Sequence, residues 1–156
     1  MNILFVCTGN KFRSRAAEIF ARADKPTNWE VESAGISTNS QGHKLPKKLD
    51  EMLDKKFGID ATLANRDHRS SRINSYDVQW ADLIVYMQPS HKKYLSRNYA
   101  VPDYKMKCLA SYATIPLKKI PDLAFISDKR KFRRVLRLIQ LCVENLIKRH
   151  QPEIRL

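Results

Sequence analysis

Short apolar runs alternate with segments of helical periodicity along this chain, and this alternation is the strongest constraint on its fold. Four apolar runs of five or six residues predict β-strands, at residues 2–7, 30–34, 82–87 and 105–109. The intervening patterns predict helices, at residues 14–23, 46–56, 90–97 and about 131–149. Alternating strands and helices need crossover connections, which make the strands parallel and place helices over both faces. We therefore expect one α/β domain over residues 1–156, built on a four-stranded parallel sheet.

The first predicted strand ends at Cys7, and this position predicts a binding site. In open parallel sheets ligands bind beyond the carboxyl ends of the strands, close to a switch in strand order. Long loops, which often carry function in a compact domain, are predicted at residues 36–45, 59–79, 98–104 and 111–127.

Composition excludes several classes of protein. The longest apolar stretches are far shorter than the roughly 20 residues that span a bilayer, so no membrane segment is expected. The N-terminal MNILFVC lacks the basic region of a signal peptide. Three cysteines at wide spacing suggest neither a disulfide framework nor a metal site. We expect a monomeric cytoplasmic protein with reduced thiols, no metal and no cofactor.

The net charge of +13 predicts an anionic partner without identifying it. The basic segments Asn65–Arg72 and Lys129–Arg134 could contact nucleic acid phosphates. No recognised nucleic-acid motif or aromatic stacking platform accompanies them, and such runs more often form a solvated face. Nucleic acid is therefore a possible partner that the sequence does not favour.

The stretch VCTGNKFRSRAAE, residues 6–18, combines a thiol with features that bind anions. Gly9 and Asn10 enter left-handed backbone conformations cheaply, so the turn can point N–H groups inward beside the start of the next helix. Such a field stabilises a thiolate at Cys7 as well as a phosphate. Arg13, six positions later, can return its planar fork to a phosphoryl group, and Ser14 can donate to the sulfur.

This stretch resembles the nucleophile loop of the low-molecular-weight protein tyrosine phosphatase family, whose usual form is VCxGNxCRSPxAE. The resemblance implies hydrolysis of phosphotyrosine or another aryl phosphate through a phosphoryl-cysteine intermediate. Cys7 would be the nucleophile and Arg13 the transition-state clamp. The rest of the phosphate-binding loop would be Thr8, Gly9, Asn10, Lys11, Phe12 and Ser14.

The resemblance also implies a general acid on a second loop, in an Asp-Pro pair ahead of the C-terminal helix. Asp122 occupies that place, with Leu123 where the family has Pro. Asp128 is the second candidate, although an acidic residue in the Ser-Asp-Lys-Arg run is more typical of a helix start.

Further positions resemble the family or depart from it. Ser33-Ala34-Gly35 and Gly58-Ile59 match, and His68 falls where the family has a histidine that supports the loop through Asn10. Gln88 replaces an Asp, and Phe12 replaces a second cysteine. Arg15 replaces a Pro and, with Lys11, adds two cations, which predicts a more cationic loop. The aromatic wall for a substrate ring is assigned to His43 and Phe125, with Phe12 as a substitute.

Three alternatives remain open at this stage. Arsenate reductases share this loop but relay a disulfide through further cysteines, whereas Cys108 and Cys142 resemble core residues. A nucleic-acid-binding module would use the basic segments. A catalytically weakened phosphatase would bind phosphate without turnover.

Overall fold

The computed structural model describes residues 1–60, 68–115 and 117–151 of the chain. Within these residues four strands form one fully parallel sheet in the order β2-β1-β3-β4. The strands are β1 (Asn2–Cys7), β2 (Glu30–Gly35), β3 (Leu83–Tyr86) and β4 (Met106–Cys108). This confirms the predicted fold class, and no strand end differs from the predicted end by more than one residue.

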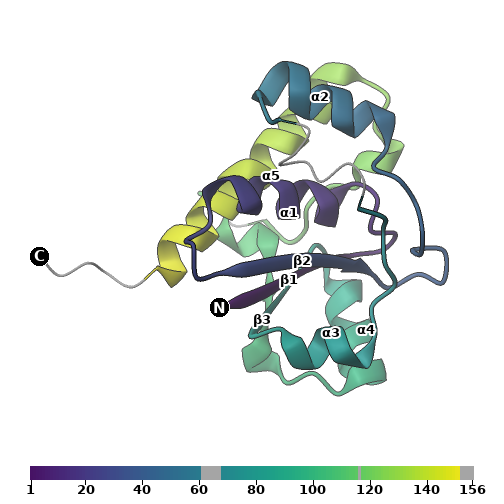
Figure 1. Cartoon of the computed structure of the whole chain (residues 1–156), viewed down its shortest axis with the longest axis vertical. Helices are drawn as coiled ribbons and strands as arrows, with labels where there is room; N and C mark the ends of the chain where they lie inside the picture. Colours follow the sequence, from purple (N-terminus) through teal and green to yellow (C-terminus); the bar gives the residue numbers. More distant parts are fainter. Residues whose placement is uncertain (61–67, 116, 152–156) are drawn as a thin grey trace, which may run out of the picture.

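Helices cover both faces of the sheet, as the alternation predicted. They are α1 (Arg13–Asp24), α2 (Lys47–Phe57), α3 (Ser75–Trp80), α4 (Pro89–Tyr99) and α5 (Lys129–His150). In Figure 1, α1 and α5 lie above the sheet with α2 beyond them, and α3 and α4 lie below. None of the helices in the described ranges is both long and apolar enough to cross a bilayer.

Strand β1 is central and is buried on both sides, so its side chains divide between two cores. Ile3 and Phe5 pack in the core under α1 and α5, whereas Leu4 and Val6 pack in the core over α3 and α4. Alternate residues of a strand point to opposite faces, and an uninterrupted apolar strand therefore serves both cores. The carboxyl end of this buried strand carries Cys7 to the edge of the sheet.

The predicted loop at 59–79 is corrected in part, because residues 75–80 form helix α3. Asn74 accepts a hydrogen bond from the N–H of Asp77, and Asp77 accepts one from the N–H of Asn74. This reciprocal cap starts a helix of only six residues, too short for a recognisable apolar period. Residues 61–67 of the predicted loop lie outside the described ranges, as does the beginning of the basic segment 65–72.

Two single-turn 3₁₀ helices occupy parts of the predicted loop at 111–127. One spans Leu109–Tyr112 and the other Leu123–Phe125. The second one positions a carboxylate beside the end of β1, as described below.

Candidate active site

The turn after β1 surrounds the sulfur of Cys7 with hydrogen-bond donors. Cys7 is buried, and its Sγ lies 2.9 Å from Oγ of Ser14. The backbone N–H of Asn10 donates to the same sulfur at 3.3 Å. Helix α1 begins at Arg13, so its N-terminal partial positive charge lies next to the thiol. The turn thus combines hydrogen-bonding groups with a helix start, a combination that binds anions.

Asn10 holds the turn in shape with its buried side chain. Its φ of 53° is a left-handed conformation that Asn tolerates better than most residues. The amide nitrogen donates to Oγ of Ser14 and Oγ of Ser33, both at 2.9 Å. The amide oxygen accepts the N–H of Ser71 at 2.9 Å. The turn is thus tied to α1, to β2 and to the segment before α3.

Gly35 ends β2 directly beside Cys7 in the sheet register. A Cβ at this position would lie 2.2 Å from Oγ of Ser40 and 2.9 Å from the backbone N of Asn10. Only glycine allows the chain to approach the nucleophile turn this closely.

The guanidinium of Arg13 is buried and held at three points. Its Nη1 donates to Oε1 of Gln88 at 2.6 Å and to the carbonyl oxygen of Ile120 at 3.1 Å. Its Nη2 lies 3.7 Å from Oδ2 of Asp122. Gln88 therefore accepts from Arg13 at the position where the family uses an Asp. A neutral amide orients the fork without cancelling its positive charge.

Asp122 lies at the start of the 3₁₀ helix Leu123–Phe125. Its Oδ1 accepts the N–H of Ala124 at 3.1 Å, and about a third of its side chain is exposed. Leu123 and Ile120 are buried in the core on either side of it. Burial of Leu123 anchors the segment in which the family has a rigid Pro.

Asp128, the second candidate acid, caps helix α5 instead. Its Oδ1 accepts the N–H of Lys131 at 2.9 Å. That hydrogen bond is the largest cause of a lowered pKa for this exposed carboxyl. The helix-start interpretation of Asp128 is confirmed.

Cys7, Arg13 and Asp122 line one cleft of about 180 Å³. Its walls also include the turn residues and two aromatic rings, as the full set shows: Thr8, Gly9, Lys11, Phe12, Ala124 and Phe125. Phe125 is 88% exposed at this cleft, and Phe12 packs edge-to-face on Phe132 with ring centroids 6.2 Å apart. A thiol, a guanidinium and a carboxylate thus face a space with aromatic walls.

His43 does not line this cleft, so the tentative assignment of this residue to the substrate wall is wrong. Its ring is exposed and Nε2 bonds to the carbonyl oxygen of Asn39 at 2.6 Å. The loop that carries His43 is held by other contacts, since the N–H of His43 donates to Oγ of Ser70.

His91 is a buried site residue that the sequence reasoning missed. The N–H of Met87 donates to its Nδ1 at 3.3 Å, so Nε2 carries the proton and donates to Oγ1 of Thr8 at 3.0 Å. Burial, helped by the positive charge of Arg13, lowers the pKa of His91 to about 3. The ring is therefore neutral and orients the first residue after the thiol. Its place one turn into the helix after β3 is the only sequence signal for this role.

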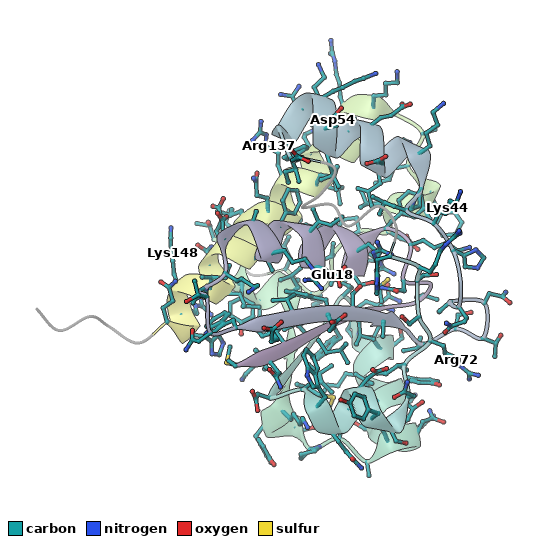
Figure 2. The ribbon with its side chains drawn as sticks, in the orientation of Figure 1. Glu18, Lys44, Asp54, Arg72, Arg137 and Lys148 are labelled. Atoms are coloured by element: carbon teal, nitrogen blue, oxygen red, sulfur yellow. The ribbon has the colours of Figure 1, made fainter. Side chains whose placement is uncertain are left out.

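Arg15 faces away from the cleft, which corrects the expectation that it makes the loop more cationic. Its Nε lies 3.5 Å from Oε2 of the fully buried Glu18. Figure 2 shows Glu18 between α1 and β2. Burial is the main cause that lowers the pKa of Arg15 and raises that of Glu18. Only Lys11, of the two extra cations, lines the cleft.

His68 lies with this buried cluster and not with Asn10. Its Nε2 is buried and has no hydrogen-bond partner among the described residues, and its carbonyl oxygen accepts from Nη1 of Arg15. Glu18, Glu32 and His68 offer three potential metal ligands within 4.8 Å of one another. Arg22, however, lies within salt-bridge distance of both carboxylates. This guanidinium and that of Arg15 oppose the entry of a cation.

Comparison with known proteins agrees with this geometry. The sequence matches the profile of the family described as low molecular weight phosphotyrosine protein phosphatase over residues 2–155. It is 30% identical over 147 residues to a low molecular weight protein-tyrosine-phosphatase of Acinetobacter johnsonii, which covers 94% of this chain and 96% of the relative. It is 28% identical over 117 residues, 73% of each chain, to a protein-arginine-phosphatase of Bacillus subtilis.

Comparison with solved structures points to the same family. A crystal structure of the low molecular weight protein tyrosine phosphatase from T. tengcongensis matches with a TM-score of 0.81 at 28% identity, over 96% of this chain and 99% of that one. The chain belongs to the low molecular weight phosphotyrosine protein phosphatase family. It is an enzyme of the cysteine-dependent phosphatase class, and the resemblance carried by VCTGNKFRSRAAE is confirmed.

Proposed function

We propose that the protein hydrolyses the phosphate monoester of phosphotyrosine side chains through a covalent phosphoryl-cysteine intermediate. The observation that carries the proposal is the convergence of Cys7, Arg13 and Asp122 on one cleft with aromatic walls. A phosphoprotein or a small aryl phosphate would be the substrate. Because the reaction needs a reduced thiol, the cytoplasm is the proposed compartment, and a monomer is the proposed working form.

In the first step the thiolate of Cys7 attacks phosphorus, a sulfur–phosphorus bond forms, and the bond from phosphorus to the phenolic oxygen breaks. Asp122, in its acid form, gives its proton to the leaving oxygen. In the second step Asp122 accepts a proton from water as the water attacks phosphorus. The sulfur–phosphorus bond breaks and inorganic phosphate leaves.

The clamp and the turn would stabilise the charge that moves in both steps. Arg13 presents a fork that suits two phosphoryl oxygens, and its contacts with Gln88 and Ile120 hold that fork before substrate arrives. Ser14 donates to the sulfur when it leaves as a thiolate. Preorganised donors of this kind lower the barrier because they need no rearrangement during the reaction.

Replacement of Cys7 by Ser tests the nucleophile. We expect Cys7→Ser to abolish turnover of an aryl phosphate while phosphate still binds, because the loop donors remain. Retained turnover would contradict the mechanism. The mechanism would also be contradicted if wild-type protein bound phosphate without any turnover, as a weakened phosphate-binding or nucleic-acid-binding module would.

Replacement of Asp122 by Asn tests the acid through the leaving group. We expect kcat to fall by roughly 10²- to 10⁴-fold for an ester with a poor leaving group, and much less for an activated phenyl phosphate that needs no proton. The matched control is Asp128→Asn, which removes a carboxyl six residues away that caps α5. A larger loss from this control would overturn the assignment.

The substrate class needs its own test, because one relative acts as a protein-arginine-phosphatase. The rings of Phe12 and Phe125 favour a phenyl group, and the ammonium of Lys11 disfavours a second cation in the cleft. Two peptides of the same sequence, one with phosphotyrosine and one with phosphoarginine, distinguish the two. We expect the higher kcat/KM for phosphotyrosine, and Lys11→Thr should reduce the preference.

A thiol relay of the arsenate reductase kind is less well supported. Burial raises the pKa of Cys142 to about 11 and also raises that of Cys108. Both therefore remain thiols at neutral pH, and a thiol does not attack the oxidised sulfur of a nucleophilic cysteine efficiently.

A further inference from the structure

Four arginines form a continuous stripe on the outer side of the first half of α5. They are Arg130, Arg133, Arg134 and Arg137, at helical positions i, i+3, i+4 and i+7, and we call this stripe the arginine face. All four are exposed and together they line a hollow of about 580 Å³. Among the described residues, none of the four guanidiniums lies within salt-bridge distance of a carboxylate.

This charge is placed where it costs the helix stability. Five of the six residues 129–134 are cations, and the first turn of α5 contains no acidic residue. The N-terminus of a helix already carries a partial positive charge, so cations there are unfavourable. Asp128 caps this end of the helix, and Glu51 of α2 lines a hollow together with Lys129. Two carboxylates do not balance five cations, and such a departure from a local rule is typical of a site that serves function.

Lysines extend the positive surface from the arginine face onto α2. A second hollow of about 420 Å³ is lined by side chains of α2 and by Lys129, the first residue of α5. Its other cations are Lys47, Lys48, Lys55 and Lys56, and its lining also includes Glu51, whose carboxylate lies 3.7 Å from Nζ of Lys47. Figure 1 shows α2 lying beside the N-terminal half of α5, and Figure 2 labels Asp54 and Arg137 in this region.

The positive surface starts at the rim of the active-site cleft. Lys48 donates its Nζ to the carbonyl oxygen of Ile126, the residue after Phe125. The same ammonium lies 4.4 Å from the ring centroid of Phe132. Phe132 in turn packs on Phe12, which lines the cleft. A substrate chain that leaves the cleft past these rings meets Lys48 and Lys129 first.

We propose that the arginine face docks an acidic segment of the phosphoprotein substrate whose phosphorylated side chain occupies the cleft. This inference rests on the proposed function, and it adds the substrate's charge pattern to it. Arg137 lies seven positions after Arg130, or about 10 Å along the helix, which matches three residues of extended chain. Carboxylates at that spacing would each meet a guanidinium fork.

Other occupants fit the surface less well. A second copy of this chain carries the same net charge of +13, which opposes self-association through this surface. A single-stranded nucleic acid would stack its bases on aromatic rings. Phe57, a ring that contacts the arginine face, is half-buried and covered by the guanidinium of Arg137 at 5.1 Å.

Steady-state kinetics with matched peptides test the proposal. Two phosphotyrosine peptides of equal length would carry Glu residues. In one they would lie on the N-terminal side of the phosphotyrosine, and in the other on the C-terminal side. A third would carry Gln in place of every Glu. The variant is Arg130→Gln/Arg133→Gln/Arg134→Gln, which spares the contact between Arg137 and Phe57. The control is Lys93→Gln/Arg97→Gln/Lys148→Gln, which removes three exposed charges from α4 and the far end of α5.

We expect wild-type enzyme to prefer one acidic peptide, with a kcat/KM that falls as salt rises. The arginine variant should lose about ten-fold in kcat/KM for that peptide, mainly through KM, because each exposed ion pair contributes modestly. The Gln peptide and a small aryl phosphate should change less than about two-fold. The control should retain the preference.

Several results would overturn the proposal. They are no preference for an acidic peptide, an equal loss in the control, or tight binding of duplex DNA at physiological salt that the arginine variant alone loses. If no aryl phosphate is hydrolysed, the proposed function fails. Fluorescence anisotropy with the labelled acidic peptide then decides the docking question by itself, since binding must be lost in the arginine variant and kept in the control.

Discussion

Two polar clusters flank the first turns of α1, and they are built in opposite ways. The cleft cluster contains Cys7, Asn10, Arg13 and Ser14, and its members bond to one another or to neighbouring backbone. The inner cluster contains Arg15, Glu18, Arg22 and His68. Several of its buried nitrogen and oxygen atoms have no hydrogen-bond partner within the part of the chain that the structure describes. Arg13 and Arg15 belong to different clusters although only one residue separates them.

The difference in hydrogen bonding indicates the role of each cluster. A buried network with satisfied donors fixes geometry, and fixed geometry is what a nucleophile and its clamp need. A buried ion pair with unsatisfied atoms gives little net stability, because desolvation offsets its Coulomb attraction. Removal of one partner is costly, however, because it leaves the other charge buried and unpaired. We therefore expect changes in the cleft cluster to appear in catalysis and changes in the inner cluster to appear in stability.

The largest expected effect separates the two arginines. Arg13→Lys should reduce kcat/KM for an aryl phosphate by about 10³- to 10⁴-fold, because a lysine cannot supply the two-pronged donation of the fork. Arg15→Lys should leave kcat/KM within about three-fold and lower the free energy of unfolding. Kinetics and urea unfolding of both variants test this, and similar activity losses would erase the distinction between the clusters.

The next effect concerns the inner ion pair. Arg15→Met should lower the free energy of unfolding by about 3 kcal/mol or more, because it removes a buried guanidinium from the buried carboxyl group of Glu18. The double variant Arg15→Met/Glu18→Leu removes both charges and should recover most of that loss. Urea unfolding measures both, with turnover as the check on folding. If the double variant is less stable than Arg15→Met, the ion pair stabilises the fold after all.

The effect that is smallest within one pH unit is a pH dependence with opposite signs at His91, which contacts the cleft turn, and at Glu18 of the inner cluster. His91 has a pKa of about 3 in the fold against about 6.5 when unfolded. The unfolded chain therefore takes up a proton that the folded chain refuses. Stability attributable to His91 should fall as pH drops from about 6.5 toward 3, by up to about 1.4 kcal/mol per pH unit. His91→Asn should remove this slope, and the exposed His43→Asn should keep it.

Glu18 should act in the other direction, because burial raises its pKa in the fold. The folded state holds this proton at a pH where the unfolded chain has lost it. Its contribution to stability is complete below the ordinary range of a Glu and falls as pH rises through the raised pKa. Urea unfolding at several pH values, with Glu18→Gln and His91→Asn side by side, should show the two slopes separately. Parallel slopes in both variants would contradict the contrast.

Sequence reasoning succeeded where chemistry is local. The turn from Cys7 to Ser14 lies between a buried strand and a helix start, so spacing alone brings the thiol, the Gly-Asn turn and Arg13 together. Asp122 was identified through resemblance, and the structure brings it to the same cleft although it lies more than a hundred residues away. The apolar runs also predicted the parallel sheet, because only buried strands tolerate such runs on both faces.

Sequence reasoning failed where the role of a residue depends on the direction in which its side chain points. Arg15 was assigned to the loop, but its position on α1 directs it toward β2 and Glu18. His43 was assigned to the cleft, and His68 to Asn10, although the contacts of both lie elsewhere. The contact between His91 and Thr8 joins helix α4 to the turn after β1, and no local sequence pattern connects these two segments.

The sequence by itself determined the fold class, the nucleophile turn and the excess of positive charge. Each of these is set by residues close together in the chain, where spacing and side-chain chemistry suffice. The tertiary structure alone decided which arginine faces the cleft, which histidine supports it, and that the excess charge gathers as a stripe beside the cleft. These depend on the directions in which side chains leave packed helices and strands, and such directions are set by contacts between distant segments.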